Sequence, residues 1–374
     1  EFPYGQIATQ VEAESTWFTA KEKFDLAALE QEVSDFNMVN ELHKKGISLM
    51  PIAFGISFTN TQMNHARALI HIYQDGSVGV STGAVEMGQS VNTKMLQVAQ
   101  SNLGISPSKI KLETTNTTRV ANTSPSAASA TSDLNGKAVE MACNSLVERL
   151  RKVAAKALSA EEKSISFRDD FVFIDDKKSS LSWEGLITQA MAQRVALSEN
   201  AHYATPKIHF DKTKEKGHPF AYHVYGTAIT TVTVDCLRGT YEIDSVRIVH
   251  DFGKSMNAGI DLGQVEGGLA QGIGWMTMEE IAYGEDGRLL SNALSTYKVP
   301  DIFSAAKTIE TIPLDTEGSE LAIQKSKAVG EPPLMYGIGT YFAIQQAVKE
   351  FNPKYRLKFH SPFTPEKVLM GLYE

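Results

Sequence analysis

The chain has 374 residues, 42% hydrophobic and 21% charged, so it is long enough for two domains with sizeable cores. A net charge of −8 argues against nucleic acid as a main partner, and no apolar run reaches the roughly 18 residues of a membrane span. The two cysteines, Cys143 and Cys236, are too few for an iron–sulfur cluster or a disulfide framework, so we expect a reduced, cytoplasmic setting.

The first half of the sequence alternates helical and hairpin patterns. Apolar alternation on both sides of QDGS predicts a hairpin, and the helix after it is expected to stop at Gly104. The polar, basic stretch 205–220 is expected to be a connecting loop. The expected elements are a helix over 21–46, a strand over 47–58 broken at Pro51 and Gly55, the hairpin over 68–83, helices over 90–104, 137–158 and 183–194, a strand over 109–115 and a short hairpin over 171–183.

The second half opens on a longer hairpin, whose two strands flank the turn LRG. The expected elements are strands over 221–236, 240–253 and 310–316, a turn at 285–287, and helices over 263–281, 334–351 and 364–374. Because both halves mix hairpins with helices, the sequence predicts an α+β fold of two lobes with mixed or antiparallel sheets. We expect a connecting helical segment at 1–47, a first lobe at 48–218 and a second lobe at 219–374.

Two stretches of the first lobe are candidates for binding a ligand. Gln89 lies in GAVEMGQSVNTKM, just before a helix whose first N–H groups would attract an anion, although an ordinary helix start explains it too. The stretch NTSPSAASATSD at 122–133 is small, polar and nearly uncharged. Its backbone could approach a bulky ligand and its hydroxyls could donate to it, whereas a flexible loop is the plainer alternative.

Two further stretches lie in the second lobe. In DLGQVEGGLAQGIG, Gly263, Gly267 and Gly272 recur at helical spacing, which permits close packing against a helix or a cofactor. In KAVGEPPL, Glu331 is held between Gly330 and two prolines at the start of an apolar helix. Proline and an acid both suit a helix start, so capping is one explanation of this glutamate and a catalytic base is the other.

Together these stretches resemble the molybdenum-cofactor region of the xanthine dehydrogenase and aldehyde oxidase family. The shared motifs, in the family's order, are GISFT at 55–59, EMGQ with TKM at 86–95, SPSAASA at 124–130, GQVEG at 263–267 and KAVGEPPL at 327–334. The resemblance runs from about residue 4 to 350 and matches the C-terminal part of the large, molybdenum-binding portion. GISFT and the Ala127–Ala128 pair are similar to the xanthine dehydrogenases of the family rather than to its aldehyde oxidases.

The resemblance implies a role for each matched residue. Molybdenum is held by the dithiolene of a pyranopterin (molybdopterin) and not by protein ligands, and a hydroxyl on the metal attacks an electron-poor carbon of the substrate. Glu331 matches the general base that takes the proton. The cofactor-binding matches are Gln89, Ser129, Thr131, Ser132 and Gln264, and the substrate-binding matches are Phe58, Thr59, Ala127 and Ala128. Phe58 would pack edge-on against a flat purine, and the reaction would carry hypoxanthine or xanthine toward urate.

The match is incomplete in two respects. GAVEMGQS differs from the family's usual GGTEMGQG at Ala84, Val85 and Ser90, which weakens the assignment of the Gln89 site. The resemblance also implies that an arginine and a second glutamate that grip the purine lie in a preceding half of the molybdenum-binding region. The 2Fe-2S and FAD domains would lie earlier still or on another subunit.

We therefore expect the chain to be a fragment or a processed subunit, since EFPYGQ lacks Met and resembles the inside of a longer chain. It would be inactive alone, with or without bound cofactor, and the complete enzyme would be a homodimer. Two alternatives stay open. One is a cofactor-free structural module that keeps the fold, and the other is aldehyde oxidation within the same family.

Overall fold

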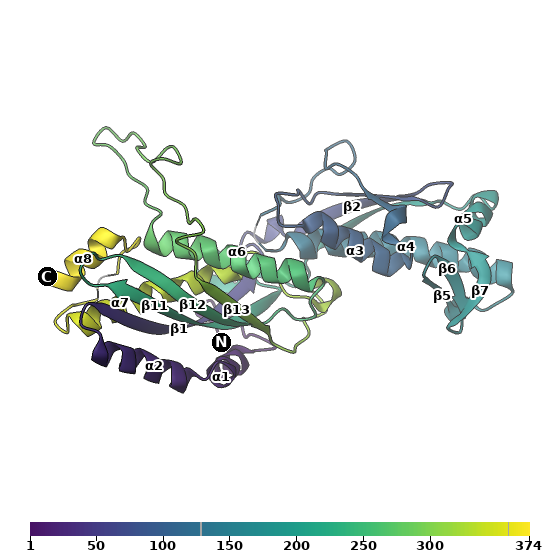
Figure 1. The fold of residues 1–374 in the computed structure, drawn as a ribbon. Helices are drawn as coiled ribbons and strands as arrows, with labels where there is room; N and C mark the ends of the chain where they lie inside the picture. The colour runs from purple at the N-terminus through teal and green to yellow at the C-terminus, as the bar shows by residue number, and fades with distance from the viewer. Residues whose placement is uncertain (128, 358) are drawn as a thin grey trace. The chain divides into compact units, whose positions relative to one another are not determined.

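The structure is a computed structural model that describes residues 1–127, 129–357 and 359–374. Helices and mixed sheets follow one another along the chain, which confirms the predicted α+β class (Figure 1). Unit 1 comprises Glu1–Ile7, Ile56–Tyr222 and Gly318–Ser326, and unit 2 comprises Ala8–Gly55, His223–Glu317 and Lys327–Glu374. The predicted lobe bounds at 48 and 219 stay a prediction. The two compact units are interleaved along the chain, and each contains segments from both sides of these bounds.

Unit 1 is built on a four-stranded sheet, with a long helix packed across two of its strands. The sheet order is β4 (Ile110–Leu112), β3 (Val78–Thr82), β2 (His65–Ile72) and β8 (Ser198–Ala204), and α3 (Val91–Leu103) and α4 (Thr131–Leu158) pack beside it. Alternate side chains of β2, from Ala66 to Ile72, are buried beneath α4, as expected for a sheet with one face in the core. The remaining elements are β5 (Ile165–Arg168), β6 (Phe171–Ile174), β7 (Lys177–Ser182), α5 (Trp183–Ala192), β9 (His209–Asp211) and β10 (Lys216–His218).

Unit 2 is a four-stranded sheet covered by helices on both faces. Its order is β1 (His43–Ile56), β11 (Tyr222–Asp235), β12 (Tyr241–His250) and β13 (Thr308–Pro313). The helices are α1 (Ala13–Lys23), α2 (Leu26–Val39), α6 (Ala258–Thr277), α7 (Ile338–Phe351) and α8 (Pro365–Tyr373). Ala20, Phe24 and Leu26 pack on Ile229 and Val249, so α1 and α2 cover one face. Side chains of α6, α7 and α8 share a core with the opposite face (Figure 1).

Several predicted elements are confirmed. The hairpin over 68–83 is β2–β3, and the long hairpin after 221 is β11–β12. Helix α3 ends at Gly104, whose φ of +67° is left-handed. A Cβ at Gly104 would lie 2.0 Å from the carbonyl oxygen of Phe167, so glycine is required there by conformation and by space.

Three local predictions were wrong. The single helix over 21–46 is two helices, because Asp25 is left-handed and its side chain accepts from Ala28 N to start α2. Strand β1 continues through both Pro51 and Gly55 without the predicted breaks, and a strand at the edge of a sheet tolerates the proline. The supposed connecting loop at 205–220 contains the β9–β10 hairpin.

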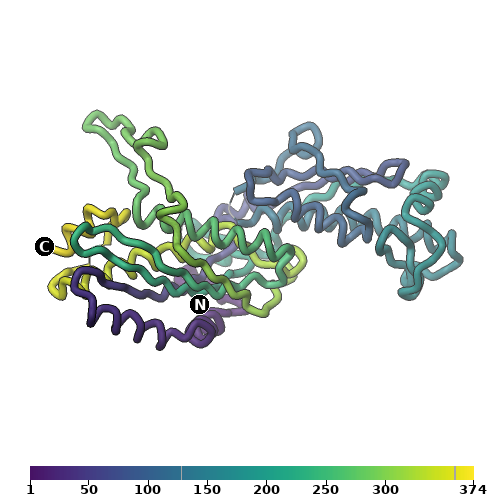
Figure 2. The backbone as a smooth tube through the Cα atoms, viewed as in Figure 1, coloured from purple at the N-terminus to yellow at the C-terminus, as the bar shows by residue number. Residues whose placement is uncertain are grey.

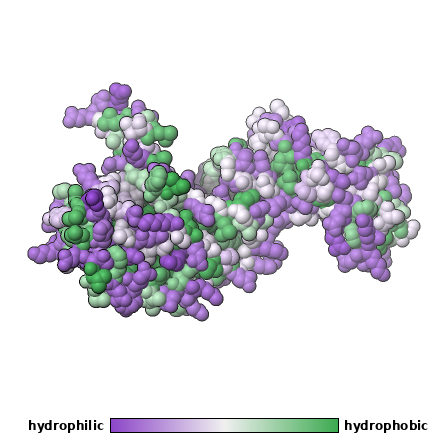
Figure 3. Space-filling model, viewed as in Figure 1, coloured by the Kyte–Doolittle hydropathy of each residue, from purple (hydrophilic) through white to green (hydrophobic). Residues whose placement is uncertain are grey.

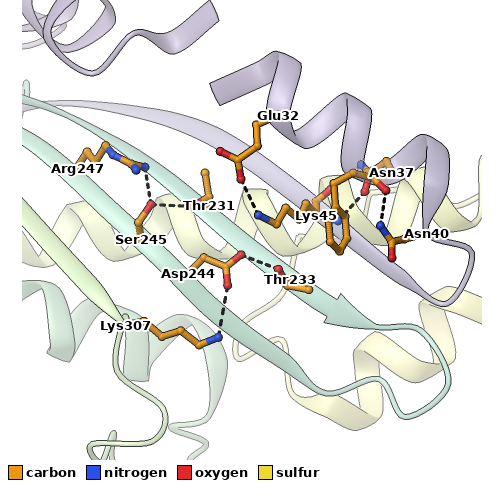
Figure 4. A network of polar contacts seen from close by, with 11 residues as sticks. Glu32, Asn37, Asn40, Lys45, Thr231, Thr233, Asp244, Ser245, Arg247 and Lys307 are labelled. Carbon is orange, nitrogen blue, oxygen red and sulfur yellow. Dashed lines mark hydrogen bonds and ion pairs between the residues drawn. The ribbon is translucent and has the colours of Figure 1, made fainter. Parts of the chain in front are cut away.

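Polar contacts join helix α2 to strand β1, and others link neighbouring strands of unit 2 (Figure 4). The Asn37 side chain accepts from Lys45 N at 2.7 Å and donates to Lys45 O at 2.9 Å, in the manner of a paired strand. Lys45 Nζ in turn lies 2.8 Å from the Glu32 carboxylate. At the other edge, Lys307 bonds Glu242 at 2.6 Å. The Asn37 contacts join α2 to β1, whereas the Lys307–Glu242 pair is exposed and contributes little to stability.

Residues 278–306 form an arm that projects from unit 2 between α6 and β13 (Figure 2). A turn at Asp286–Gly287 closes a small hairpin near its middle, as the sequence predicted. The arm carries apolar side chains in contact with solvent (Figure 3), including Leu294, Ile302 and Phe303, which are 81%, 84% and 92% exposed. Among the described residues, no helix is long and apolar enough to cross a membrane.

Candidate active site

Glu331 lies in unit 2, on the turn that leads into helix α7. It is the N-cap of a 3-10 segment, η5 (Pro332–Gly337), and its carbonyl oxygen accepts from Leu334 N at 3.1 Å. Gly330 and Glu331 are exposed, while Pro332 and Pro333 are buried. The predicted α-helix from 334 thus begins with a tighter turn, and the glutamate stands at its open end.

Helix α6 supports that turn through glycine. A Cβ at Gly272 would lie 2.0 Å from the carbonyl oxygen of Leu334, and one at Gly268 would lie 3.0 Å from Pro333 Cβ. A Cβ at Gly337 would lie 2.2 Å from the carbonyl carbon of Gly272. At these positions glycine allows the backbones of α6 and η5 to pack closely together. This agrees with the first of the two alternatives, packing against a helix.

Gln264 lies on the same stripe of α6 as these glycines. It precedes Gly268 by one turn, and residues four apart share a helix face. Since Pro333 meets Gly268 and Gly337 meets Gly272, η5 runs alongside α6 in the same direction. Glu331 precedes Pro333 in the chain, as Gln264 precedes Gly268, so both residues lie on the same side of the Gly268–Pro333 contact.

The space beside Gln264 is open. A Cβ built on Gly263 or Gly267 would meet no atom of the described residues within 4 Å, and Gln264 itself is half-buried. Helix interiors rarely carry glycine without a steric reason, because each costs roughly 1 kcal/mol relative to alanine. In the part of the chain that the structure describes, Gly268 and Gly272 have such a reason, whereas Gly263 and Gly267 have none.

In unit 1, Phe58 is positioned by a buried asparagine. The Asn64 side chain accepts from Phe58 N at 2.8 Å and donates to Phe58 O at 2.9 Å. Asn64 is 2% exposed, so both backbone groups are held in a sheltered place. Phe58 itself is half-buried and Thr59 is exposed, which leaves the predicted substrate residues accessible on a fixed loop.

Gln89 closes the loop in which it lies. Its side chain accepts from Met87 N at 2.6 Å and donates to Val85 O at 2.9 Å. The neighbouring Glu86 carboxylate accepts from the backbone N–H groups of Ser90 and Asn92 at 2.9 and 3.1 Å, and so occupies the start of α3. Partial burial raises the Glu86 pKa, but these backbone hydrogen bonds outweigh it and hold the pKa below its usual value.

The small-residue loop joins the Phe58 and Gln89 loops. Ser126 Oγ accepts from Val85 N at 2.7 Å, and Ser124 N donates to His65 O at 3.3 Å. A Cβ at Gly83 would lie 2.3 Å from Thr123 Cγ2, so the loop lies directly on the end of β3. Three predicted ligand-binding segments therefore meet at one end of the unit 1 sheet.

The other predicted residues of unit 1 lie along the same loop. Ala127 is exposed, Ser129 is half-buried, and Thr131 and Ser132 form the first turn of α4. Ala128 lies outside the described residues. The polar start of this 28-residue helix therefore adjoins the loop, with its first N–H groups at that end.

Asp133, in the first turn of α4, is a buried residue that sequence reasoning missed. Its carboxylate accepts from the Tyr222 hydroxyl at 2.6 Å and from Ile323 N at 2.8 Å. Burial raises the pKa of Asp133 to about 6, against the opposing effect of those hydrogen bonds. Its partners lie about 90 and 190 residues away, so no local pattern could have indicated its role.

The residues present fit a bulky cofactor better than a protein-held metal ion. Each of the two predicted cofactor glutamines stands beside glycine that faces open space, namely Gly88 at Gln89 and Gly263 at Gln264. Across the described parts of the chain, no three His, Cys, Asp or Glu side chains gather in a way that could hold a metal. Primary amides can pair with the donors and acceptors of a pterin edge.

Comparison with known proteins supports this interpretation. The family model described as molybdopterin cofactor-binding domain matches residues 19–305. Over 348 residues the chain is 39% identical to the xanthine dehydrogenase/oxidase of Mus musculus, covering 91% of this chain and 24% of that protein. Over 379 residues it is 36% identical to the xanthine dehydrogenase of Oryza sativa subsp. japonica, covering 98% of this chain and 26% of that protein.

Solved structures share the fold. Quinoline 2-oxidoreductase from Pseudomonas putida 86 matches 99% of this chain and 47% of its own chain, with a TM-score of 0.84 at 21% identity. The aldehyde oxidoreductase of Desulfovibrio gigas matches 100% of this chain and 37% of its own, with a TM-score of 0.81 at 23% identity.

The chain belongs to the molybdopterin cofactor-binding domains of the molybdenum hydroxylases. Within that class, the curated relatives named above are xanthine dehydrogenases, which confirms the resemblance found in the sequence. The chain spans about a quarter of the length of those relatives.

Proposed function

We propose that this chain supplies one part of the active site of a xanthine dehydrogenase-like enzyme, which hydroxylates hypoxanthine and xanthine toward urate. Glu331 is the general base of this reaction. The observation that carries the proposal is the exposed residue Glu331 on a turn that packs backbone against the glycines of α6, the helix that also carries Gln264. A helix cap alone would not need this bracing.

The cofactor, when bound, supplies the oxygen transfer and accepts the two electrons of the oxidation. Glu331 accepts a proton at a carboxylate oxygen, which makes the attacking oxygen a better nucleophile. Gln89 in unit 1 and Gln264 in unit 2 would each offer a primary amide to the pterin, and Ser129, Thr131 and Ser132 would offer hydroxyls to it.

Substrate orientation is assigned to the loop that Asn64 fixes. Phe58 packs against the purine ring, and Thr59 lies beside it. Ala127 and Ala128 leave room near the reacting carbon because their side chains are small. An aromatic side chain with two rotatable bonds, on a loop clamped at both backbone groups, orients a flat ring with little loss of entropy.

The partners are proposals of the same kind. The preceding half of the molybdenum-binding region would contribute the purine-gripping residues, and 2Fe-2S and FAD domains would carry the electrons onward. The complete enzyme would be a cytoplasmic homodimer. The apolar arm at 278–306 supports a partner surface, because side chains such as Phe303 are rarely left in solvent as a group. The chain spans about a quarter of the length of its relatives, which also supports the proposal that it acts together with further domains.

The test of the base is Glu331→Gln in the complete, molybdenum-loaded enzyme, with Glu366→Gln as the matched control. Glu366 is an exposed glutamate on α8 of the same unit. We expect turnover to fall by roughly 100-fold or more in the first variant, within the range of general-base catalysis, with molybdenum content unchanged. Retention of turnover would refute the assignment, and joint loss of metal and turnover would indicate a structural residue.

A second test separates the enzyme part from a cofactor-free structural module. Molybdenum would be measured per chain in this polypeptide alone and in the complete enzyme. Metal in the complete enzyme supports the proposal. Its absence there, under conditions that load relatives, would favour the module.

A further inference from the structure

The turn that carries Glu331 is attached on both flanks to two consecutive residues at the end of strand β12. Lys327 lies four residues before the glutamate and bonds Asp251, and Tyr336 lies five residues after it and bonds His250. All of these partners are buried, whereas Glu331 between them is exposed. The sequence motif KAVGEPPL gave no sign of this arrangement.

The upstream attachment is a buried ion pair. The side chains of Lys327 and Asp251 are 1% and 0% exposed, and Lys327 Nζ donates to Asp251 Oδ2. Asp251 Oδ1 also accepts from Thr316 Oγ1 at 2.6 Å and from Gly253 N at 3.2 Å. Lys327 N donates to Phe252 O at 2.7 Å, so the main chain is fixed at the same point.

A buried pair of this kind holds geometry strongly. Removing one partner leaves an uncompensated charge, whereas a matched apolar replacement of both is often neutral for stability. The pair is therefore weak evidence for stabilisation and better evidence for a conformational constraint on the residues attached to it.

The downstream attachment uses the Tyr336 hydroxyl. It shares a hydrogen bond of 2.7 Å with His250 Nδ1, and both side chains are fully buried. A Cβ at Gly226 would lie 1.7 Å from the tyrosine oxygen, so β11 has glycine where the hydroxyl enters the sheet. Burial lowers the pKa of His250 to about 4, so its ring stays neutral and free to share a proton with the hydroxyl.

We propose that His250 and Asp251 form a two-point clamp that positions Glu331 for proton transfer, through Tyr336 and Lys327. The clamp residues are buried and would act through Glu331, so they are positioning residues. The proposal rests on the proposed role of Glu331 as the base. General-base catalysis depends on placement, since a displacement of about 1 Å can lower a rate by roughly 100-fold.

The test uses the complete, molybdenum-loaded enzyme with two clamp variants. The double variant Asp251→Asn/Lys327→Met keeps an oxygen for Thr316 and Gly253 N and keeps an apolar stem, but removes the charges. Tyr336→Phe removes only the hydroxyl. The matched control is Glu242→Gln/Lys307→Met, which removes an exposed ion pair of 2.6 Å from the same sheet.

Three quantities would be measured for each variant: molybdenum content, kcat and KM per bound molybdenum, and hydrogen exchange of the peptide 326–337. For the clamp variants we expect unchanged metal, kcat lowered by about 100-fold with KM nearly unchanged, and faster exchange in that peptide. The control should match the unmodified enzyme in all three. Unchanged kcat per molybdenum, or unchanged exchange, would overturn the proposal.

A Glu331→Gln background shows whether the clamp acts through the base. We expect the double variant to lower kcat no further in that background, because the group that it positions is already disabled. An undiminished further loss would overturn the clamp as a positioning device. If Glu331→Gln alone retains activity, the proposed base is wrong, and hydrogen exchange then decides by itself whether His250 and Asp251 hold the turn.

Discussion

Replacing Gly272 with alanine should separate helix α6 from the turn that carries Glu331. The new Cβ would lie 2.0 Å from Leu334 O and 3.1 Å from the Gly337 Cα, and both are backbone atoms that no rotamer change can move. Overpacking of this kind costs about 1–3 kcal/mol, and contact with backbone places this site at the upper end. Alanine is about 1 kcal/mol more favourable than glycine inside a helix, so the net decrease in stability should be about 2 kcal/mol.

Gly267→Ala in the same helix is the matched control. Among the residues that the structure describes, no atom lies within 4 Å of its added Cβ, so only the helix propensity changes and the helix should gain about 0.5–1 kcal/mol of stability. Hydrogen exchange of the α6 amides measures both changes locally. We expect exchange to rise roughly 30-fold for Gly272→Ala and to fall for Gly267→Ala. A shift in the same direction in both variants would refute the packing argument.

Two further predictions concern pH and the Phe58 loop. Burial lowers the pKa of His250 from its ordinary 6.5 to about 4, so the unfolded chain binds the proton more readily than the folded chain. The free energy of unfolding of unit 2 should therefore fall by up to about 3 kcal/mol as pH falls from 6.5 to 4. Burial raises the pKa of Asp133 to about 6, so unit 1 should gain stability as pH falls from 6.5 to 4. Hydrogen exchange, corrected for its intrinsic pH dependence, measures the stability of each unit. A change in the same direction in both units would contradict the two pKa shifts. Asn64→Ala should weaken the Phe58 loop by about 2 kcal/mol, because two sheltered backbone groups lose their partners, and unchanged exchange at the Phe58 amide would argue against this clamp.

Much of the fold followed from sequence because its signals are local. The alternation in β2, the turn between β2 and β3 and the stop at Gly104 each depend on a few neighbouring residues. Pro51 misled the prediction, because proline forbids only an inner strand and the sequence does not say which strand lies at an edge.

Some of the candidate site residues could likewise be found from the sequence, and others could not. Glu331, Gln89 and Gln264 stood out because their motifs resemble a known family, and their chemical roles remain predictions. Asn64, Asp133 and the Lys327–Asp251 pair carried no local signal. Lys327 lies 76 residues from Asp251, and only the fold brings the two together. Supporting residues are therefore the part of this site that needed the structure.

The interleaving of the two units sets an order for folding during synthesis. Residues 56–222 can collapse as soon as they leave the ribosome, because nearly all of unit 1 is contained in them. Strand β1 is made early, but its partner β11 begins at residue 222, on the order of 10–30 s later at about 5–20 residues per second. Through that interval β1 presents an unpaired edge, so unit 2, which holds Glu331, can complete its sheet only after β11 has been made.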